Sequence, residues 1–572
     1  MPYRSPVEEY LFLLDHVVGY DRVAATDRFG EASADVTAAM LEEAGKLCDE
    51  VLAPLRRVSD LNPARLENGI VRTPPGFAEA WEQMAENGLL GMTAPAALGG
   101  LGLPMSLASA VHDMMSGACL SIQLTPLMVQ GQIDALDHHA EDWIRELYIP
   151  KLASGAWAAT MNLTEPQAGS DVGALSTRAE PNGDGSYAIT GQKIYITGGD
   201  NDFTENVSHL VLARLPDGAP GTKGISLFVV PKLLPDENGA SGARNSLKVV
   251  GLEHKLGLHG SATCVMSYEG ATGWMVGGPH QGMRAMFTMM NNARLGVGIQ
   301  GIGVAEGAWQ HAMAFAADRR QGRAPVEGGT GSIVDHADVR RMLMTMKAEI
   351  FAARAIAAAC AVAIDMEAAT GAADWAARAA VLTPIAKAFG TDTGVDVSNL
   401  GLQVHGGMGV IEEAGAAQFL RDVRVTTIYE GTNGIQAMDL VGRKLSDGGE
   451  AVQALLDEIE AEAEEARATL PELAEAVWQA TETLRETTEA LLAAGTLNDR
   501  FAGAVPYLRG FARVLGGHFH LRAARTVQGQ GPRHALARFY ILRLLPEHAG
   551  HLAHSRAGAD DLYALTAEEL AA

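Results

Sequence analysis

Cysteines and long apolar runs are scarce in this sequence. Only four cysteines occur among 572 residues, at Cys48, Cys119, Cys264 and Cys360, and none forms a C-x-x-C pair. We therefore expect neither a disulfide framework nor a zinc site, and we expect a reducing compartment. No stretch approaches the roughly 20 uninterrupted apolar residues of a membrane-spanning helix. The first 22 residues mix acidic with apolar side chains and have no basic flank, so we predict no secretory signal, no transmembrane segment and a cytoplasmic protein.

Positive charge is also in short supply. Lysine and arginine number 44 against 69 aspartates and glutamates, which gives a formal net charge of −25. A surface that must neutralise phosphates needs the opposite sign, so nucleic acid is not an expected partner. With 47% apolar and 20% charged residues the composition is that of an ordinary globular protein, and its length predicts three or four domains.

Hydrophobic periodicity divides the chain into successive units. After an N-terminal extension over 1–35, helical spacing of apolar residues predicts a helical domain over 36–157. Short β-rich runs separated by turn clusters predict a β-domain over 158–279. Alanine- and methionine-rich helical stretches return over 280–446, and a further helical domain is expected over 447–572. The predicted fold class is α+β and mostly α.

The last unit contains an acidic run at Glu458–Glu465. The run is a candidate docking surface, but charges at this spacing are far more often a solvated helix face. We favour the solvated face and predict no chemistry there.

Several common site signatures are missing. There is no G-x-x-x-x-G-K-[ST] loop, H-E-x-x-H motif or G-x-S-x-G elbow. Gly298, Gly301, Gly303 and Gly307 do not match G-x-G-x-x-G and follow no strand of a βαβ unit, so no Rossmann domain is expected. We predict no metal site.

The first unusual polar segment is Met161–Asp171, which is followed by Gly191–Gly198. Backbone amides and hydroxyls of such a loop can hydrogen-bond a polar heterocycle while the strand aromatic covers its face. Two ordinary β-turns explain these residues equally simply, and on general loop chemistry they are the favoured interpretation of the segment alone.

Two further segments, Asp318–Arg323 and Gln403–Gly409, combine three arginines with closely spaced glycines. Arginines and exposed backbone suit an anion such as a pyrophosphate. The alternatives are a surface salt-bridge patch and, for His405, a structural histidine.

The fourth segment is Ile428–Gln436, in which Glu430 precedes Gly431 in an apolar context. Desolvation raises the pKa of such a carboxyl and suits it to act as a base near neutral pH. The alternative is a loop glutamate without a role.

Taken together and in this order, the segments resemble the acyl-CoA dehydrogenase family over residues 36–445. The motifs that carry the resemblance are T-E-P-x-A-G-S-D, G-Q-K-x-[WY]-I-T, R-x-Q-G-R, Q-x-x-G-G-x-G and Y-E-G-T. The opening stretch around Tyr3, Pro6 and Phe12, with the long helical tail, is similar to the 3-methylmercaptopropionyl-CoA dehydrogenase branch.

The resemblance implies FAD held partly across a homodimer or a larger homo-oligomer. The residues that it implies for the flavin ring are Leu163, Thr164, Gly169, Ser170, Tyr195 and Thr197. Those implied for the remainder of FAD are Arg319, Gln321, Gln403 and Gly407 from the neighbouring subunit, with Thr432 and Asn433 near the adenine.

The implied reaction is α,β-dehydrogenation of an acyl-CoA thioester, with Glu430 removing the α-proton. Some relatives carry the base just before the residue that is Arg294 here, but this chain has Ala293 at that place. The implied substrate contacts are Ser170, Asn291, Arg294, Tyr429 and Gly431. Electron-transfer flavoprotein is the expected electron acceptor.

Three positions depart from the family pattern. Tyr195 stands in place of tryptophan, the arginine turn lacks a common phenylalanine, and Gly434 replaces a common glutamine. The alternative functions are an acyl-CoA oxidase that uses oxygen, a β-oxidation dehydrogenase of different chain-length preference, and a non-enzymatic helical scaffold.

Overall fold

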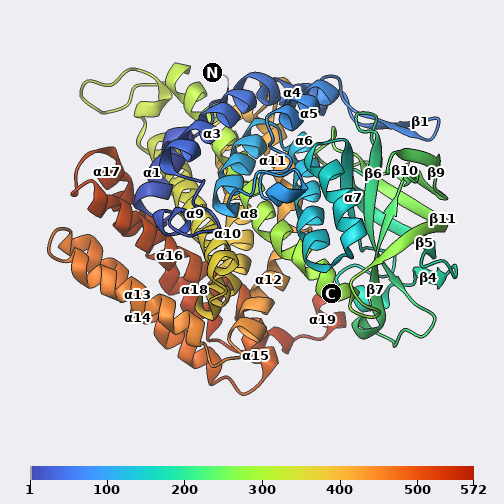
Figure 1. Ribbon diagram of the computed structural model, residues 1–572. Helices are drawn as coiled ribbons and strands as arrows, with labels where there is room; N and C mark the ends of the chain where they lie inside the picture. Colours follow the sequence, from blue (N-terminus) through green and yellow to red (C-terminus); the bar gives the residue numbers. More distant parts are fainter. Residues whose placement is uncertain (1–2) are drawn as a thin grey trace. The chain divides into compact units, whose positions relative to one another are not determined.

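The computed structural model describes residues 3–572, a succession of helices interrupted by one β-rich stretch (Figure 1). Two compact units are present. Among the described residues, one unit contains residues 3–5 and 39–293, and the other contains residues 6–38 and 294–572. The predicted order of a helical region, a β-region, a helix bundle and a further helical region is confirmed. No helix within residues 3–572 combines the length and apolarity needed to cross a bilayer.

The unit of residues 39–293 begins with helices. They are α3 (Ala34–Leu47), α4 (Ala53–Leu61), α5 (Phe77–Glu86), α6 (Met105–His139) and α7 (Asp142–Ala153). A two-stranded hairpin of β1 (Arg65–Glu67) and β2 (Ile70–Arg72) interrupts them.

A seven-stranded sheet follows in the same unit. Its strands are β3 (Trp157–Asn162), β4 (Arg178–Pro181), β5 (Tyr187–Thr197), β6 (Asn206–Arg214), β7 (Ile225–Pro231), β10 (Leu247–Leu252) and β11 (Thr263–Val276). Their order is β10-β11-β5-β4-β6-β3, and β7 pairs with both β11 and β6, which closes part of the sheet on itself. Ile189, Phe228 and Tyr268 lie in its core. A second hairpin joins β8 (Leu233–Pro235) to β9 (Ser241–Arg244).

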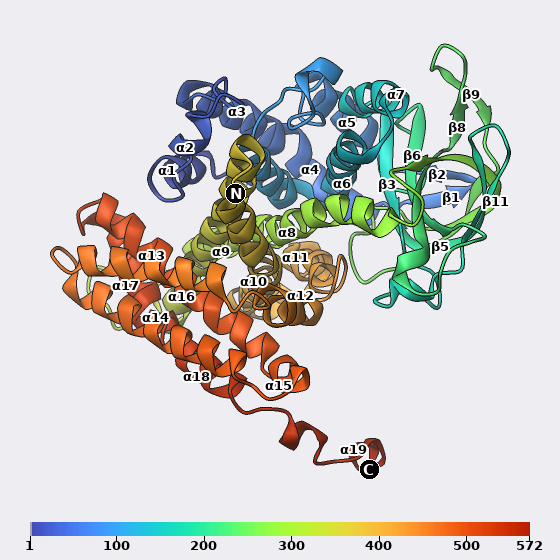
Figure 2. The same cartoon turned by 60° about the horizontal axis from the view of Figure 1, so that its bottom comes forward.

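The other unit is helical. The chain enters it within α8 (Gly282–Asp318), and the following bundle helices are α9 (Ala337–Thr370), α10 (Ala373–His405), α11 (Ala416–Val423) and α12 (Asn433–Asp439). The further helices are α13 (Glu450–Ala466), α14 (Pro471–Leu492), α15 (Leu497–Ala502), α16 (Ala504–Thr526), α17 (Gly531–Phe539), α18 (Glu547–Ser555) and α19 (Ala567–Ala571). The short α1 (Val7–His16) and α2 (Asp21–Ala24) belong to the same unit. Helix α16 packs against α9 and α12 of the bundle and against α13 and α14, and α13 also contacts α10 directly (Figure 2).

Glycines allow a close crossing of two helices in this unit. A Cβ atom at Gly298 of α8 would lie 2.5 Å from the Ala386 carbonyl oxygen of α10, and one at Gly390 would lie 2.5 Å from the Gly298 oxygen. Likewise, a Cβ atom at Gly301 would lie 2.4 Å from the Gly390 carbonyl oxygen. Only glycine lets the two backbones approach this far. Gly298 and Gly301, which match no nucleotide loop, therefore lie at the crossing of α8 with α10, and α8 is a continuous helix.

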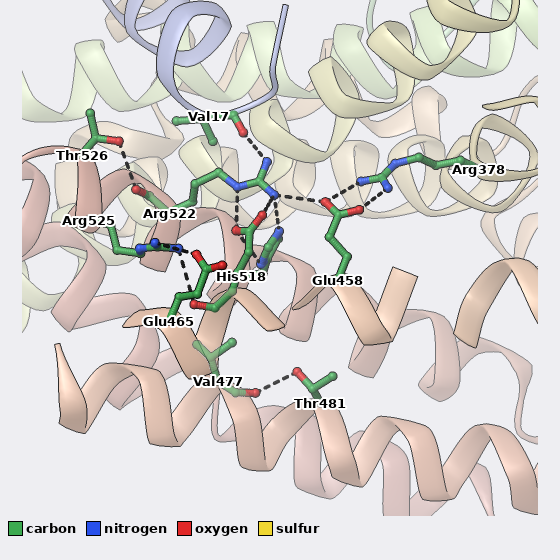
Figure 3. Close-up of polar contacts among 11 residues, drawn as sticks. Val17, Arg378, Glu458, Glu465, Val477, Thr481, His518, Arg522, Arg525 and Thr526 are labelled. Carbon is green, nitrogen blue, oxygen red and sulfur yellow. Dashed lines mark hydrogen bonds and ion pairs between the residues drawn. The ribbon is translucent and has the colours of Figure 1, made fainter. Parts of the chain in front are cut away.

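The acidic run of α13 is a solvated face only in part: Glu464 and Glu465 are exposed, as the favoured interpretation predicts, whereas Glu458 and Glu462 are partly buried and paired. Arg522 of α16 donates from Nε to Glu462 Oε2 at 2.9 Å and from Nη2 to Glu458 Oε1 at 3.1 Å (Figure 3). Arg378 of α10 also donates to Glu458, and Arg522 Nη1 donates to the Val17 carbonyl oxygen at the end of α1. Glu458 and Glu462 lie four residues apart on α13, so both carboxylates reach Arg522 of α16. Together with Arg378 of α10 and the end of α1, these contacts join four segments of the unit.

A metal ion has little room in this cluster. Glu458, Glu462 and His518 each offer a ligand atom within 4.8 Å of the others. However, Arg522 also donates to His518 Nε2 at 3.1 Å, so one guanidinium contacts all three groups. Burial would raise the pKa of Glu458, but Arg378 and its other cationic neighbours lower it to about 2. Burial and Arg522 lower the pKa of His518 well below its usual value.

Replacing Arg522 tests its role in joining the helices. We expect Arg522→Met to destabilise the protein by about 1–3 kcal/mol, because it removes the main partner of the partly buried Glu462 carboxylate and leaves Glu458 with Arg378 alone. The matched control is Arg538→Met, which removes an exposed pair with Glu472 and is expected to change little. Thermal unfolding measured for both variants checks this, and equal melting temperatures for the two would contradict it.

Candidate active site

Tyr429 fixes the segment that carries Glu430. Its hydroxyl donates a hydrogen bond to the buried Gln300 side chain of α8. On the other side, Thr432 caps α12 by accepting a hydrogen bond from the Ile435 backbone N–H at 3.2 Å. The Y-E-G-T residues are therefore held at both ends, by a helix crossing on one side and by an N-cap on the other.

The backbone at Glu430 is unusual. Glu430 has φ +56° and Gly431 has φ +87°, both in the left-handed region. A Cβ atom at residue 431 would lie 2.6 Å from Gln436 Nε2, and this amide donates to the Glu430 and Gly431 carbonyl oxygens at 3.4 and 3.5 Å. Glycine is therefore required at 431, and the strain at Glu430 is of the kind that accumulates at functional sites.

Burial and two cations govern the charge of Glu430. Its side chain is half-buried, and desolvation by the surrounding protein raises its pKa to about 7, against the attraction of Arg294 and Lys387. Arg294 lies on α8, is nearly inaccessible to solvent, and pairs with Asp439 at 3.8 Å. A carboxyl with such a pKa is largely ionised just above neutrality and is basic enough to take a proton.

Lys387 was not among the residues singled out from the sequence. Its side chain is completely buried on α10, and burial lowers its pKa to about 8. The ammonium donates to Asn433 Oδ1 at 2.8 Å, so the Asn433 amide faces α10. The sequence did offer a signal for it: Lys387 is the one charged residue in the apolar helical run Pro384–Phe389, and a lysine buried in such a run needs a polar partner.

The loop after β3 is held by a buried ion pair. Lys193 Nζ of β5 donates to Glu165 Oε1 at 2.9 Å and to the Leu163 carbonyl oxygen at 3.0 Å. The Ile194 N–H donates to the Thr164 oxygen at 2.9 Å, which brings both predicted flavin segments side by side. Burial would raise the pKa of Glu165, but Lys193 and the hydroxyl and amide donors around it lower it. Neither Lys193 nor Glu165 was a predicted site residue, although both are letters of the two motifs.

These contacts leave the predicted ring-binding surface open. Tyr195 is 61% exposed and has φ +61°, so its ring stands out from the strand. Gly169 and Ser170 are exposed, and Leu163, Thr164 and Thr197 are half-buried. An exposed aromatic beside polar loop groups suits a flat heterocycle.

The remaining predicted residues lie in the helical unit, apart from Asn291. Arg319, Gln321, Gln403 and Gly407 are all exposed, and the Arg319 guanidinium has no hydrogen-bond or ion-pair partner within residues 3–572. Asn291 is exposed on the part of α8 that belongs to the other unit.

His405 has structural surroundings. It is buried, its ring centroid lies 4.8 Å from that of His311 and 4.4 Å from that of Phe315, and its Nδ1 contacts the Gly401 oxygen at 2.7 Å. This supports the interpretation of His405 as a structural histidine.

The ion pair under the loop generates a prediction. Lys193→Met leaves the Glu165 carboxylate buried without a cation, so we expect a loss of about 3–5 kcal/mol of stability and weaker binding of the heterocycle predicted for this loop. The double variant Lys193→Met with Glu165→Gln removes the lone charge and should recover most of the melting temperature. Thermal unfolding and the visible spectrum of the purified variants measure both effects. A double variant no more stable than the single one would contradict the explanation.

Comparison with known families covers nearly the whole chain. Residues 35–156, 160–271 and 280–446 match the models of the N-terminal, middle and C-terminal domains of acyl-CoA dehydrogenase. Residues 455–566 match the model described as acetyl-CoA dehydrogenase C-terminal like.

Individual relatives agree. The chain is 46% identical to 3-methylmercaptopropionyl-CoA dehydrogenase of Ruegeria pomeroyi over 468 residues, which is 81% of this chain and 79% of the relative. It is 36% identical to a butyryl-CoA dehydrogenase of Syntrophomonas wolfei, over 72% of this chain and 71% of the relative. The fold is similar to that of Caenorhabditis elegans ACDH-11 in complex with C11-CoA, with a TM-score of 0.78, 20% identity, and coverage of 94% of this chain and 91% of that one. The chain therefore belongs to the acyl-CoA dehydrogenase family and is an oxidoreductase that acts on a CH–CH bond.

Proposed function

We propose that this enzyme converts an acyl-CoA thioester to the trans-2-enoyl-CoA, with Glu430 as the base that removes the α-proton. The observation that carries the proposal is the desolvated Glu430 carboxyl, whose pKa is raised to about 7. The α-CH of a thioester is a very weak acid, so a carboxylate of ordinary basicity in water cannot remove its proton at a useful rate.

The thioester oxygen also needs a hydrogen-bond donor as negative charge develops on it. The Glu430 backbone N–H donates to no acceptor within the described residues, which supports its use for this purpose. We infer that Tyr429 and Gly431 shape this part of the substrate site. Arg294, Asn291 and Ser170 are the other proposed substrate contacts.

We propose FAD as the cofactor, which supplies a hydride acceptor when bound. The exposed Tyr195 ring and the polar loop beside it support binding of the flavin, through Leu163, Thr164, Gly169, Ser170, Tyr195 and Thr197. Thr432 and Asn433 are proposed for the adenine end. The Asn433 side chain already has protein partners on α10, so any contact from this residue to adenine would use its backbone.

Arg319, Gln321, Gln403 and Gly407 are proposed to serve the FAD of a second copy in a homodimer or larger assembly. The exposed guanidinium of Arg319, which lacks a partner within residues 3–572, supports this assignment because a free cation on a strongly acidic chain suits a pyrophosphate.

The proposed substrate is 3-methylmercaptopropionyl-CoA, because the 3-methylmercaptopropionyl-CoA dehydrogenase of Ruegeria pomeroyi is 46% identical to this chain over 468 residues. A straight-chain acyl-CoA of the kind used in β-oxidation is the second candidate, since a butyryl-CoA dehydrogenase is 36% identical. Initial rates with a panel of acyl-CoA thioesters of both kinds separate them. The proposed compartment is the reducing cytoplasm, and the four buried cysteines, which form no disulfide, agree with it.

Glu430→Gln tests the base. The amide fills the same space without basicity, so we expect kcat to fall by about 10²–10⁴-fold while acyl-CoA and FAD binding persist. The matched control is Glu413→Gln, an exposed glutamate outside the site, which should keep wild-type turnover. Stopped-flow flavin bleaching and binding titrations provide the measurements. Near-normal bleaching in Glu430→Gln would refute the assignment.

Electron-transfer flavoprotein is the proposed electron acceptor, and oxygen is the alternative. After anaerobic reduction by substrate, we expect the flavin absorbance to return slowly on admission of air and rapidly on addition of electron-transfer flavoprotein. Rapid return in air would instead identify an acyl-CoA oxidase.

A further inference from the structure

A series of hydrogen bonds links Arg509 of the C-terminal helices to Lys387, the buried lysine whose charge acts on Glu430. Arg509 of α16 donates to Asp392 Oδ2 from Nε at 3.2 Å and from Nη2 at 3.1 Å. Asp392 Oδ1 accepts from Asn433 Nδ2 at 2.8 Å, and Asn433 Oδ1 accepts from Lys387 Nζ at 2.8 Å. All four residues belong to the same compact unit.

The direction of the Asn433 amide follows from its partners. Lysine can only donate and a carboxylate can only accept, so Oδ1 must face Lys387 while Nδ2 faces Asp392. The Ala388 carbonyl oxygen also accepts from Nδ2 at 3.2 Å, and the Thr391 hydroxyl lies beside the amide. Asp392 therefore holds Asn433 in the orientation that binds the Lys387 ammonium.

The Arg509 end of this series of hydrogen bonds is exposed, and the Lys387 end is buried. The Arg509 side chain is 50% exposed and Asp392 is 22% exposed, whereas Lys387 is completely buried. A buried cation needs fixed partners because it has lost its water. Asn433 is the only side-chain hydrogen-bond acceptor that the described residues offer to Lys387 Nζ, so any movement of that amide moves the ammonium.

Other charges surround the base and the lysine. On α8 there is Arg294, and on α12 and the turn after it there are Asp439 and Arg443. Tyr429 precedes the base, and Asp392 faces Lys387 from α10 itself. Arg294 and Lys387 are the two cations that act directly on Glu430. Lys387 is connected to the C-terminal helices through Asn433, Asp392 and Arg509.

We propose that Arg509 and Asp392 are positioning residues through which the C-terminal helical region holds the Lys387 ammonium beside Glu430 and so sets the protonation of the base. The link itself is electrostatic and structural. Its catalytic consequence rests on the proposed function of Glu430.

The sign of the effect follows from charge. A nearby cation favours the ionised carboxylate, so removing or loosening Lys387 raises the pKa of Glu430 and leaves more of it protonated at neutral pH. Loss of Arg509 leaves Asp392 free to move and so weakens the hydrogen bond from Lys387 to Asn433. We therefore expect it to raise the pKa of Glu430 as well, but by less than the loss of Lys387 does.

Infrared titration of the intact, FAD-loaded enzyme tests the link without turnover. The carbonyl band of protonated Glu430 is assigned by comparison with the Glu430→Gln variant, in which that band is missing. We expect Lys387→Met to move its midpoint upward by at least about one pH unit, and Arg509→Gln to move it upward by about half a unit. Arg509→Lys keeps the cation and should stay near the wild-type midpoint.

The matched control is Arg525→Gln on the same helix, which breaks an exposed pair with Glu465 far along α16 from Asp392 and should not move the midpoint. Because Arg509 is half-exposed, its variants are expected to fold. The acidic limb of kcat/KM should shift with the infrared midpoint in Arg509→Gln.

An Arg509→Gln midpoint equal to those of the wild type and Arg525→Gln would overturn the proposal. Failure of the proposed function gives a different result, namely normal turnover by Glu430→Gln. In that case a shifted midpoint in Arg509→Gln would still establish the link to the C-terminal helices.

Discussion

The site depends on one electrostatic balance, between the desolvation of the Glu430 carboxyl and the two cations that face it. Burial alone would keep the carboxyl protonated, and cations alone would make it an ordinary weak base. Arg294 and Lys387 come from different helices, so the balance requires α8 and α10 to meet closely and in one register. Small displacements at this crossing would change the charge of Glu430, the proposed base.

Close approach of α8 and α10 is made possible by glycine. At Gly298, Gly301 and Gly390 a side chain would collide with the backbone of the facing helix. The same crossing carries Gln300, which accepts a hydrogen bond from the Tyr429 hydroxyl and so fixes the loop that bears Glu430. The helix packing and the geometry around Glu430 therefore depend on the same few residues, and a larger residue at the crossing would disturb both.

The C-terminal helices do more than cover the bundle. Arg522 joins α13 and the end of α1 to α16, while Arg509 of the same helix reaches Asp392 in the bundle. Both contacts place an arginine of α16 on carboxylates of another helix, where partial burial strengthens the attraction relative to that of a fully exposed pair. Helix α16 thus connects the region beyond residue 446 to the segment that holds Lys387.

The sequence by itself determined the order of helical and β-regions, because hydrophobic periodicity reports which face of an element is buried. Joint recurrence of five motifs also determined the family and singled out Glu430. Only the tertiary structure decided the role of Lys387, of the Lys193–Glu165 pair, and of the acidic run of α13. Whether a charged side chain faces solvent or an opposite charge depends on residues that can lie hundreds of positions away, and a local sequence pattern does not predict which distant residues come into contact.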